Sequence, residues 1–399
     1  MTFKKVLGKV HLWLGFSSGL VVFIVALTGC VLAFEQEIRS LTQPYWYVTP
    51  PPNGNVLPPS VLREKAEKAL PGKAADGALY SLPNRSVDIG FYNFDPEYYY
   101  IVYVNPYTGE VLHVWDESKD FFHWVLSGHN ALWLPDKIGK AIVGAATILF
   151  VFMLLTGLVL WWPKNWSAAK QRFSIKWSAA WRRKNYDLHN VLGFYILLVG
   201  LTFAVTGLVW SYQWFSQSLY WATGGKGSDA YVIPPSDTTV ARTVSSPMEA
   251  VDRVWRNYLK KFPNHQGINL SFPQEPTASI YSYVNYRHGT FYKVDYHYYN
   301  QHSLEEIPAS GPYSGLYENA PLASKLRRMN YDLHVGAIWG LPGKILIFCA
   351  SLICASLPVT GFIIWWGRRK KAKKTGQKIG QAKAIRHVLA AHHRSGVAK

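Results

Sequence analysis

Four histidines recur at matched places in the chain, and their type and spacing suit redox chemistry. His11 and His189 each open the pattern His-x-x-Leu-Gly-Phe at the start of an apolar run, and His129 and His334 each precede another such run. Ionisable residues at membrane depth are functional candidates, and two facing imidazoles are what a low-spin b-type haem requires. The sequence therefore predicts two haems, one held by His11 and His189 and the other by His129 and His334.

Other metal chemistry fits this set of residues less well. Zinc and copper sites gather three or four ligands, often with a carboxylate or thiolate among them, and no Asp or Glu lies within the four apolar runs. The cysteines, Cys30, Cys349 and Cys354, all lie inside these runs and form no haem-attachment motif, which excludes covalent c-type haem. The chain also has no Ser/His/Asp constellation and no phosphate-binding glycine loop, so we expect no nicotinamide or flavin chemistry.

Four Thr-Gly pairs accompany the histidines. Thr28 follows His11 by 17 residues, which is about 25 Å along a helix and places it level with His129 and His334. We expect a glycine at such a depth to let a porphyrin approach the helix backbone, although small residues also serve helix packing. Thr206-Gly207 lies on the outer side in the same way. Thr156-Gly157 and Thr360-Gly361 lie at the inner side, level with His11 and His189.

Several other residues are weaker candidates. His123 lies six residues before His129 and competes with it as the outer ligand. His288, His297 and His302 lie in one segment and could bind a metal, but surface histidines of a strand-rich domain explain them equally well. Four arginines follow or precede the histidines closely enough to pair with haem propionates: Arg182, Arg183, Arg327 and Arg328.

Four apolar runs must position these residues. Each run holds 22 or 23 residues without Asp, Glu, Lys or Arg, and a helix needs about 20 such residues to cross a hydrocarbon core of roughly 30 Å. The sequence therefore predicts four transmembrane helices, over residues 12–34, 141–162, 191–212 and 345–366.

The positive charge is gathered in three segments. The chain has 42 Lys and Arg against 24 Asp and Glu, and residues 1–11, 163–186 and 367–399 carry 21 of the basic residues and none of the acidic ones. By the positive-inside rule these segments are cytoplasmic, so we expect both termini in the cytoplasm and residues 35–138 and 213–338 on the other side of the membrane. The basic tail can meet anionic lipid headgroups, and we expect no nucleic-acid partner.

The chain repeats itself. The separation from His11 to Thr28 recurs between His189 and Thr206, and the second and fourth apolar runs share their lysine, Thr-Gly and Trp-Trp positions at equal offsets. Residues 1–166 and 186–367 therefore form two parallel repeats. In each repeat the outer segment has a predicted helix, 58–70 or 248–262, followed by strands. These strands are expected at 86–92, 98–104 and 110–114 in the first repeat, and at 279–286 and 290–299 in the second.

These motifs resemble a known family. The run Val-Asn-Pro-Tyr-Thr-Gly-Glu-Val at 104–111, after a helix and a strand, resembles a PepSY domain. The His-x-x-Leu-Gly motifs, Thr-Gly pairs and Trp-Trp span ends resemble the PepSY-associated transmembrane family over residues 5–367. That resemblance implies a bacterial inner-membrane ferric-siderophore reductase with two haems, a haem-dependent oxidoreductase. The sequence leaves its electron donor open between quinol and a cytosolic reductase. The turn at 299–303 lacks the glycine of the PepSY pattern.

The predicted fold is a membrane α-helical protein with α+β outer domains, a four-helix transmembrane bundle in which each repeat carries one PepSY-like domain. The boundaries are 1–41, 129–166, 186–220 and 329–367 for the transmembrane helices, 42–128 and 221–328 for the periplasmic domains, 167–185 for the cytoplasmic linker and 368–399 for the basic tail.

Two other functions remain open on the sequence. The first is a siderophore or iron transporter, which four spans without charges or helix breaks disfavour. The second is a membrane-anchored PepSY module that inhibits another protein, which leaves the four matched histidines unexplained. A visible spectrum of the purified protein separates electron transfer from both.

Overall fold

The computed structural model describes residues 2–52, 54–163, 165 and 169–395. Residues 167 and 168 of the predicted linker and residues 396–399 of the predicted tail lie outside this range. The chain divides into two compact units. The first contains Met1–Leu27, Ile148–Leu201 and Ala350–Lys399, and the second contains Thr28–Thr147 and Thr202–Cys349.

Long apolar helices identify a membrane protein. Helices α1 (Phe3–Leu32), α5 (Asp136–Trp161) and the first 30 residues of α12 (Leu341–Ser395) are each long and apolar enough to cross a membrane. The predicted third span is broken, because α7 (Trp181–Tyr195) and α8 (Leu197–Ser211) meet at an angle of 61°. Gly193 and Gly200 flank the break, and glycine supports a helix interior poorly.

Two short helices carry His129 and His334 outside the long spans. We expected both histidines at the ends of the spans, but α4 (Phe121–Ala131) and α11 (Leu322–Val335) end before α5 and α12 begin. The residues that directly follow these helices are Leu132 after α4 and Gly336 after α11. Both have the left-handed conformation that closes many helices. Each histidine therefore lies on the last turn of a separate helix. Two further short helices follow the first and third spans: α2 (Glu35–Thr42) and α9 (Gln213–Ala222).

The two outer domains share one antiparallel sheet. Its seven strands have the order β4-β3-β2-β1-β5-β6-β7, so the two domains meet where β1 pairs with β5. The predicted strands of both domains are confirmed, whereas β1 and β5 were not predicted because they are short and begin with glycine. The strands are β1 (Gly77–Tyr80), β2 (Val87–Phe94), β3 (Glu97–Val104), β4 (Val111–Asp116), β5 (Gly267–Ser271), β6 (Ile280–Asn285) and β7 (Val294–Tyr299).

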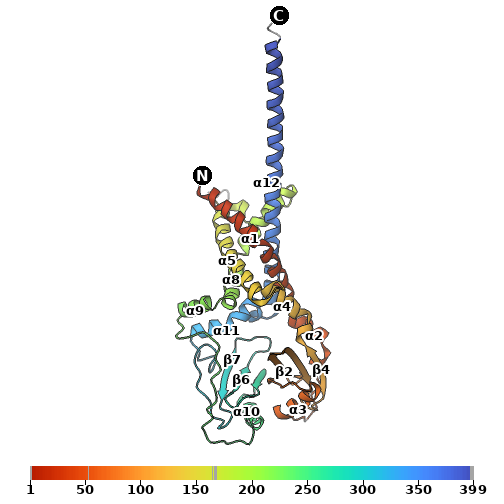
Figure 1. Ribbon diagram of the computed structural model, residues 1–399, viewed down its shortest axis with the longest axis vertical. Coiled ribbons are helices and arrows are strands. Elements are labelled where there is room, and N and C mark those ends of the chain that lie inside the picture. Colours follow the sequence, from red (N-terminus) through yellow and green to blue (C-terminus); the bar gives the residue numbers. More distant parts are fainter. Residues whose placement is uncertain (1, 53, 164, 166–168, 396–399) are drawn as a thin grey trace. The chain divides into compact units, whose positions relative to one another are not determined.

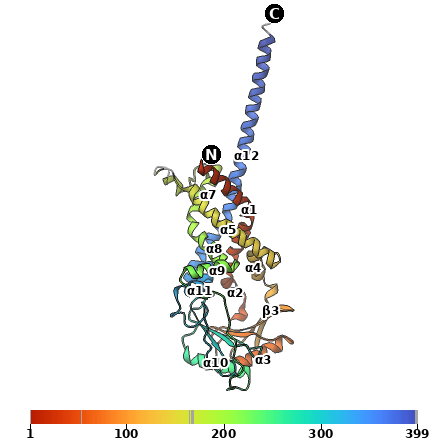
Figure 2. The ribbon, with the colours of Figure 1, turned by 60° about the vertical axis from the view of Figure 1, so that its left-hand side comes forward.

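One face of the sheet is covered by helices α3 (Pro59–Ala69) and α10 (Pro247–Lys261), close to their predicted positions (Figures 1 and 2). The core lies between these helices and the sheet and includes Leu62, Ile89, Val251 and Ile268, each almost completely buried. Alternation along the strands sends every second side chain to this core. Asp252 of α10 accepts hydrogen bonds from the amide and the hydroxyl of Ser60 in α3, at 3.0 and 2.6 Å. Both halves of the chain thus build a single core.

The β1–β5 junction can be tested with two glycines that face each other across β1 and β2. A Cβ on Gly77 would lie 2.7 Å from the carbonyl oxygen of Leu270 in β5, whereas a Cβ on Gly90 would have no atom within 4 Å. We expect Gly77→Ala to lower the free energy of unfolding by about 1–3 kcal/mol because backbone atoms must shift, and Gly90→Ala to change it by less than about 0.5 kcal/mol. Denaturant unfolding in detergent, followed by circular dichroism, measures both. Equal effects of the two substitutions would contradict the close approach of β1 and β5.

Candidate functional site

The outer histidines face each other in the second unit. The ring centres of His129 and His334 are 6.1 Å apart, and the ring planes are at 80°. Two imidazoles that bind one metal ion from opposite sides, with metal–nitrogen bonds of about 2 Å, hold their ring centres roughly 6 Å apart. The outer pair therefore has the separation that an iron between the two rings requires.

Every one of the four histidines meets a threonine from another helix. In the second unit, His334 Nδ1 lies 2.7 Å from Oγ1 of Thr206, and His129 Nδ1 lies 3.1 Å from Oγ1 of Thr28. In the first unit the same contact joins His11 to Thr156 at 2.8 Å and His189 to Thr360 at 2.9 Å. His11 and His189 are also close enough to interact electrostatically. Each threonine is the one that the sequence placed at the depth of its histidine.

The threonines set which ring nitrogen carries the proton. The hydroxyls of Thr206, Thr156 and Thr360 donate to carbonyl oxygens four residues earlier in their own helices, at 2.6, 2.7 and 2.9 Å. Their oxygens are left to accept from Nδ1–H of the histidine. The neutral imidazole then presents the lone pair of Nε2, which is the form that binds a metal.

The glycines of the Thr-Gly pairs make room for the imidazoles. A Cβ on Gly157 would lie 3.4 Å from Cε1 of His11, and one on Gly361 would lie 3.2 Å from Cε1 of His189. On Gly207 it would lie 3.9 Å from Cε1 of His334. The atoms nearest to Gly157, Gly361 and Gly207 belong to the histidine rings. The approach of a porphyrin to these glycines stays a prediction.

A five-residue repeat that sequence reasoning missed supports two of the histidines. Asn-Tyr-Asp-Leu-His occurs at 185–189 and again at 330–334. Asn185 donates to the carbonyl oxygen of Thr360 at 3.1 Å, and Asn330 donates to that of Thr206 at 3.1 Å. Each asparagine thus holds the threonine that orients its histidine. The identical pentapeptide was the signal by which the sequence could have revealed both asparagines.

The aspartates of this repeat fasten the helices to neighbouring segments. Asp332 is completely buried and accepts from the amide of Phe291 at 3.0 Å, which ties α11 to the β6–β7 loop. In the first unit, buried Asp187 accepts from the amide of Lys176 at 3.3 Å, which ties α7 to the segment before it. Their carboxylates thus fix the helices that carry His334 and His189.

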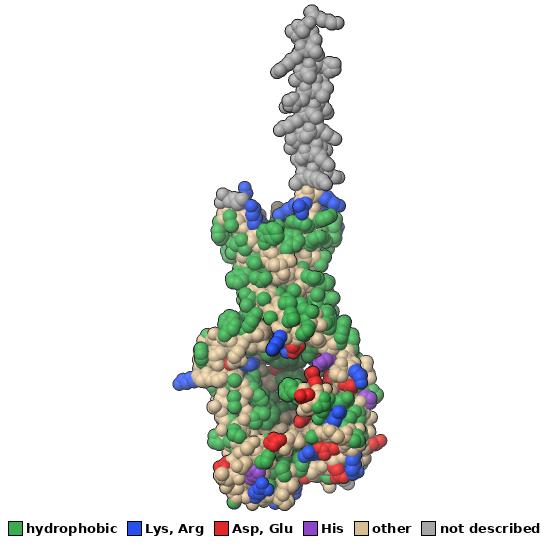
Figure 3. Space-filling model, in the orientation of Figure 1, with side chains coloured by type: hydrophobic (Ala, Val, Ile, Leu, Met, Phe, Trp, Pro, Cys, Tyr) green, Lys and Arg blue, Asp and Glu red, His purple; other side chains and the backbone are tan. Residues whose placement is uncertain are grey.

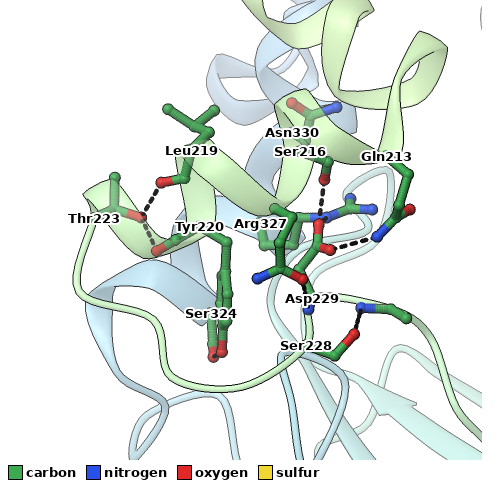
Figure 4. Close-up of polar contacts among 12 residues, drawn as sticks. Gln213, Ser216, Leu219, Tyr220, Thr223, Ser228, Asp229, Ser324, Arg327 and Asn330 are labelled. Atoms are coloured by element: carbon green, nitrogen blue, oxygen red, sulfur yellow. Dashed lines mark hydrogen bonds and ion pairs between the residues drawn. The ribbon is translucent and has the colours of Figure 1, made fainter.

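Two arginines hold α11 in place. Buried Arg328 donates to three carbonyl oxygens, those of Pro312, Val294 and Ser314, at 2.5, 2.8 and 2.7 Å. Its neighbour Arg327 lies 3.3 Å from the buried carboxylate of Asp229 (Figure 4), which also accepts from residues of α9. These bonds give both guanidinium groups structural partners within the protein. Their pairing with haem propionates stays a prediction.

The other histidine candidates are not brought together. His123 is exposed near the start of α4, and its amide caps the helix by donating to Asp120 at 3.0 Å. His297 meets Glu306 at 2.6 Å and His302 meets the carbonyl oxygen of Pro276 at 2.9 Å, while His288 is exposed. Among the described residues, no group of three or more His, Cys, Asp or Glu side chains is arranged to hold a metal ion. The outer-domain histidines therefore form no metal site in this part of the chain.

The fold and the paired histidines define a class of membrane protein, one with apolar helices, a unit of α+β structure and histidines that contact threonines. The particular family follows from comparison with known proteins: the family described as the PepSY-associated TM region matches residues 9–368, so the chain belongs to it. This confirms the resemblance that the sequence motifs indicated. No curated protein matches the chain significantly.

Neighbouring arginines on α11 provide a test of how the His334 helix is held. We expect Arg328→Lys to lower the free energy of unfolding by about 2–3 kcal/mol, because an ammonium group cannot reach all three carbonyl oxygens and leaves buried acceptors unsatisfied. Arg327→Lys is the matched control and should cost less than about 1 kcal/mol, since it keeps a cation beside Asp229. Denaturant unfolding of the full chain in detergent measures both. A larger loss for Arg327→Lys would show that the ion pair, and not the three carbonyl bonds, holds α11.

Proposed function

We propose that this protein transfers electrons across the bacterial inner membrane through two b-type haems and reduces an acceptor outside. The observation that carries the proposal is the outer pair, with its 6.1 Å ring separation and a threonine at each Nδ1. Haem, when bound, supplies a one-electron Fe(III)/Fe(II) couple. The residues of this chain hold Nε2 of His129 and His334 toward one haem, and Nε2 of His11 and His189 toward the other.

The architecture in this proposal has four spans from two parallel repeats. It counts α7 and α8 together as one span, which their combined length and apolar character allow. The repeated contact of one histidine with one threonine, four times in the chain, supports this arrangement. Helix α1 carries both His11 and Thr28, so a single helix contributes to both haem sites.

The proposed direction of electron flow is from the cytoplasm outward. It rests on the 21 basic residues in segments without acidic ones, which place both termini in the cytoplasm. The donor is then quinol or a cytosolic reductase, and the acceptor meets the large outer unit. Following the family resemblance, the acceptor is a ferric siderophore. Reduction to Fe(II) weakens the bonds to the oxygen ligands and releases the metal, which makes the protein an oxidoreductase.

One observation favours the transporter alternative more than the sequence did. The break between α7 and α8 removes the argument that all spans are unbroken, and broken helices often line transport sites. The regulatory alternative gains no comparable support. The transporter and the regulatory alternatives both predict a purified protein without bound haem. Haem bands in the visible spectrum would therefore contradict both, and their absence would contradict the electron-transfer proposal.

The haem proposal predicts a defined stoichiometry. Each single substitution His11→Ala, His189→Ala, His129→Ala or His334→Ala should remove about half of the haem, because each leaves one complete pair. Haem per protein, measured as the pyridine haemochrome, gives the result. His123→Ala is the matched control and should leave both haems bound. Loss of all haem from one substitution, or of none from all four, would overturn the assignment of pairs.

The acceptor proposal predicts reduction on one side of the membrane. We expect reduced protein in right-side-out vesicles to be reoxidised without oxygen by an impermeant ferric siderophore added outside, with Fe(II) trapped by a chelator. The haem spectrum and the Fe(II) complex are followed together. His334→Ala should slow this oxidation at least tenfold. Reoxidation only in inside-out vesicles would reverse the proposed direction, and no reoxidation in either would reject ferric chelates as acceptors.

A further inference from the structure

The face of the sheet opposite α3 and α10 forms the floor of a hollow. Directly paired residues run across it in one row, from β4 to β7: His113, Tyr103, Asp88, Leu79, Asn269, Tyr283 and Tyr296. Figure 3 shows the second unit hollowed in this region. At about 4.8 Å between strands, the floor from β3 to β6 is roughly 19 Å wide.

Aromatic rings close both ends of this floor and leave its middle open. At one end Tyr45 stacks on His113 with ring centres 4.2 Å apart. At the other end Tyr313 lies edge-on to Tyr296 at 5.6 Å. Between them, Gly90 faces open space, because a Cβ there would have no atom within 4 Å. The hollow therefore has tyrosines at both ends and a glycine in its floor.

Asp88 is the acidic residue of the row. Asp88 is a partly buried residue. Burial raises the pKa of its carboxyl group to about 7. Among the described residues, none forms a hydrogen bond or ion pair with this side chain. Arg85, the nearest cation, instead lies over the rings of Trp46 and Tyr47 at 4.5 and 4.8 Å. A recessed carboxylate without a partner is costly unless something else meets it.

The floor is also tied to the helix that carries His334. The guanidinium of Arg328 lies 4.9 Å above the ring of Tyr296, at the β7 end of the row. Asp332, two residues before His334, holds the amide of Phe291 in the loop between β6 and β7. Helix α11 thus contacts both the sheet and the outer histidine pair.

We propose that this hollow binds the electron acceptor, a ferric chelate without net negative charge, and that Asp88 meets a cationic group on it. The proposal rests on the function proposed above. Tyrosine π faces attract cations, tyrosine hydroxyls can donate to hydroxamate oxygens, and an unpaired carboxylate repels an anionic tris-catecholate. One electron passes from the reduced protein to Fe(III) of the chelate and gives Fe(II), and no bond to the protein forms.

The test compares two chelates that differ by one charge. A linear ferric tris-hydroxamate with a terminal ammonium group and its N-acetylated, neutral form are each given to the reduced protein in detergent without oxygen. Asp88→Asn should raise KM for the ammonium form about tenfold, because one ion pair is lost, and leave KM for the acetylated form unchanged. Glu110→Gln removes an exposed carboxylate of the same outer domain and should change neither. An equal change for both chelates with Asp88→Asn, or no change for either, overturns the role of Asp88.

A second variant tests the hollow itself. Gly90→Leu should raise KM at least fivefold for both chelates, because its side chain fills the open floor, while the haem spectrum and the unfolding midpoint stay those of the parent protein. Unchanged KM values would place the acceptor elsewhere. Hexacyanoferrate(III), a small oxidant, should reoxidise the parent protein and Glu110→Gln at one rate. If the parent protein reacts with hexacyanoferrate(III) but with neither chelate, the ferric-siderophore function itself fails. If the parent protein reduces both chelates and neither Asp88→Asn nor Gly90→Leu changes any KM, only this inference is overturned.

Discussion

The hydrogen bond between a threonine hydroxyl and Nδ1 of a histidine is the interaction on which the rest of this structure depends. Each such bond contributes about 0.5–1.5 kcal/mol, which is modest, but it fixes a ring orientation and a tautomer. It also fixes the position of one helix along another, as where Thr206 of α8 contacts His334 of α11. For Thr206, Thr156 and Thr360, the proton is committed to the threonine's own helix, so the direction of the bond to the histidine is set.

Further polar contacts hold the partners of this hydrogen bond in place. Asn330 and Asn185 donate to the carbonyl groups of two of these threonines. Asp332 and Asp187 tie the same helices to adjoining segments by accepting from the amides of Phe291 and Lys176. The left-handed residues Leu132 and Gly336 separate α4 and α11 from the long spans. Their histidines can therefore face each other without following the course of a membrane helix.

The shared sheet places residues from both halves of the chain on one face, which neither outer domain could do alone. Asp88 comes from the first half of the chain and Tyr283 from the second, and they lie on one floor because β1 pairs with β5. Burial of one face under α3 and α10 leaves the other face to polar and aromatic side chains. A chelate in the proposed hollow would contact both repeats. This offers a physical reason for the two outer domains to be joined.

The sequence by itself determined the elements whose signals are local. The length of the apolar runs was enough to predict three spans. The alternation of apolar and polar residues predicted strands such as β2 and β6, and the rise per residue of a helix predicted that Thr28 lies at the depth of His129. Only the tertiary structure decided the β1–β5 junction, the break after Tyr195 and the separate helices of His129 and His334. Strands β1 and β5 are too short to have a strong pattern, and their pairing joins residues almost 200 positions apart. The unpaired state of Asp88 likewise depends on which strands lie beside it, and no local pattern records that.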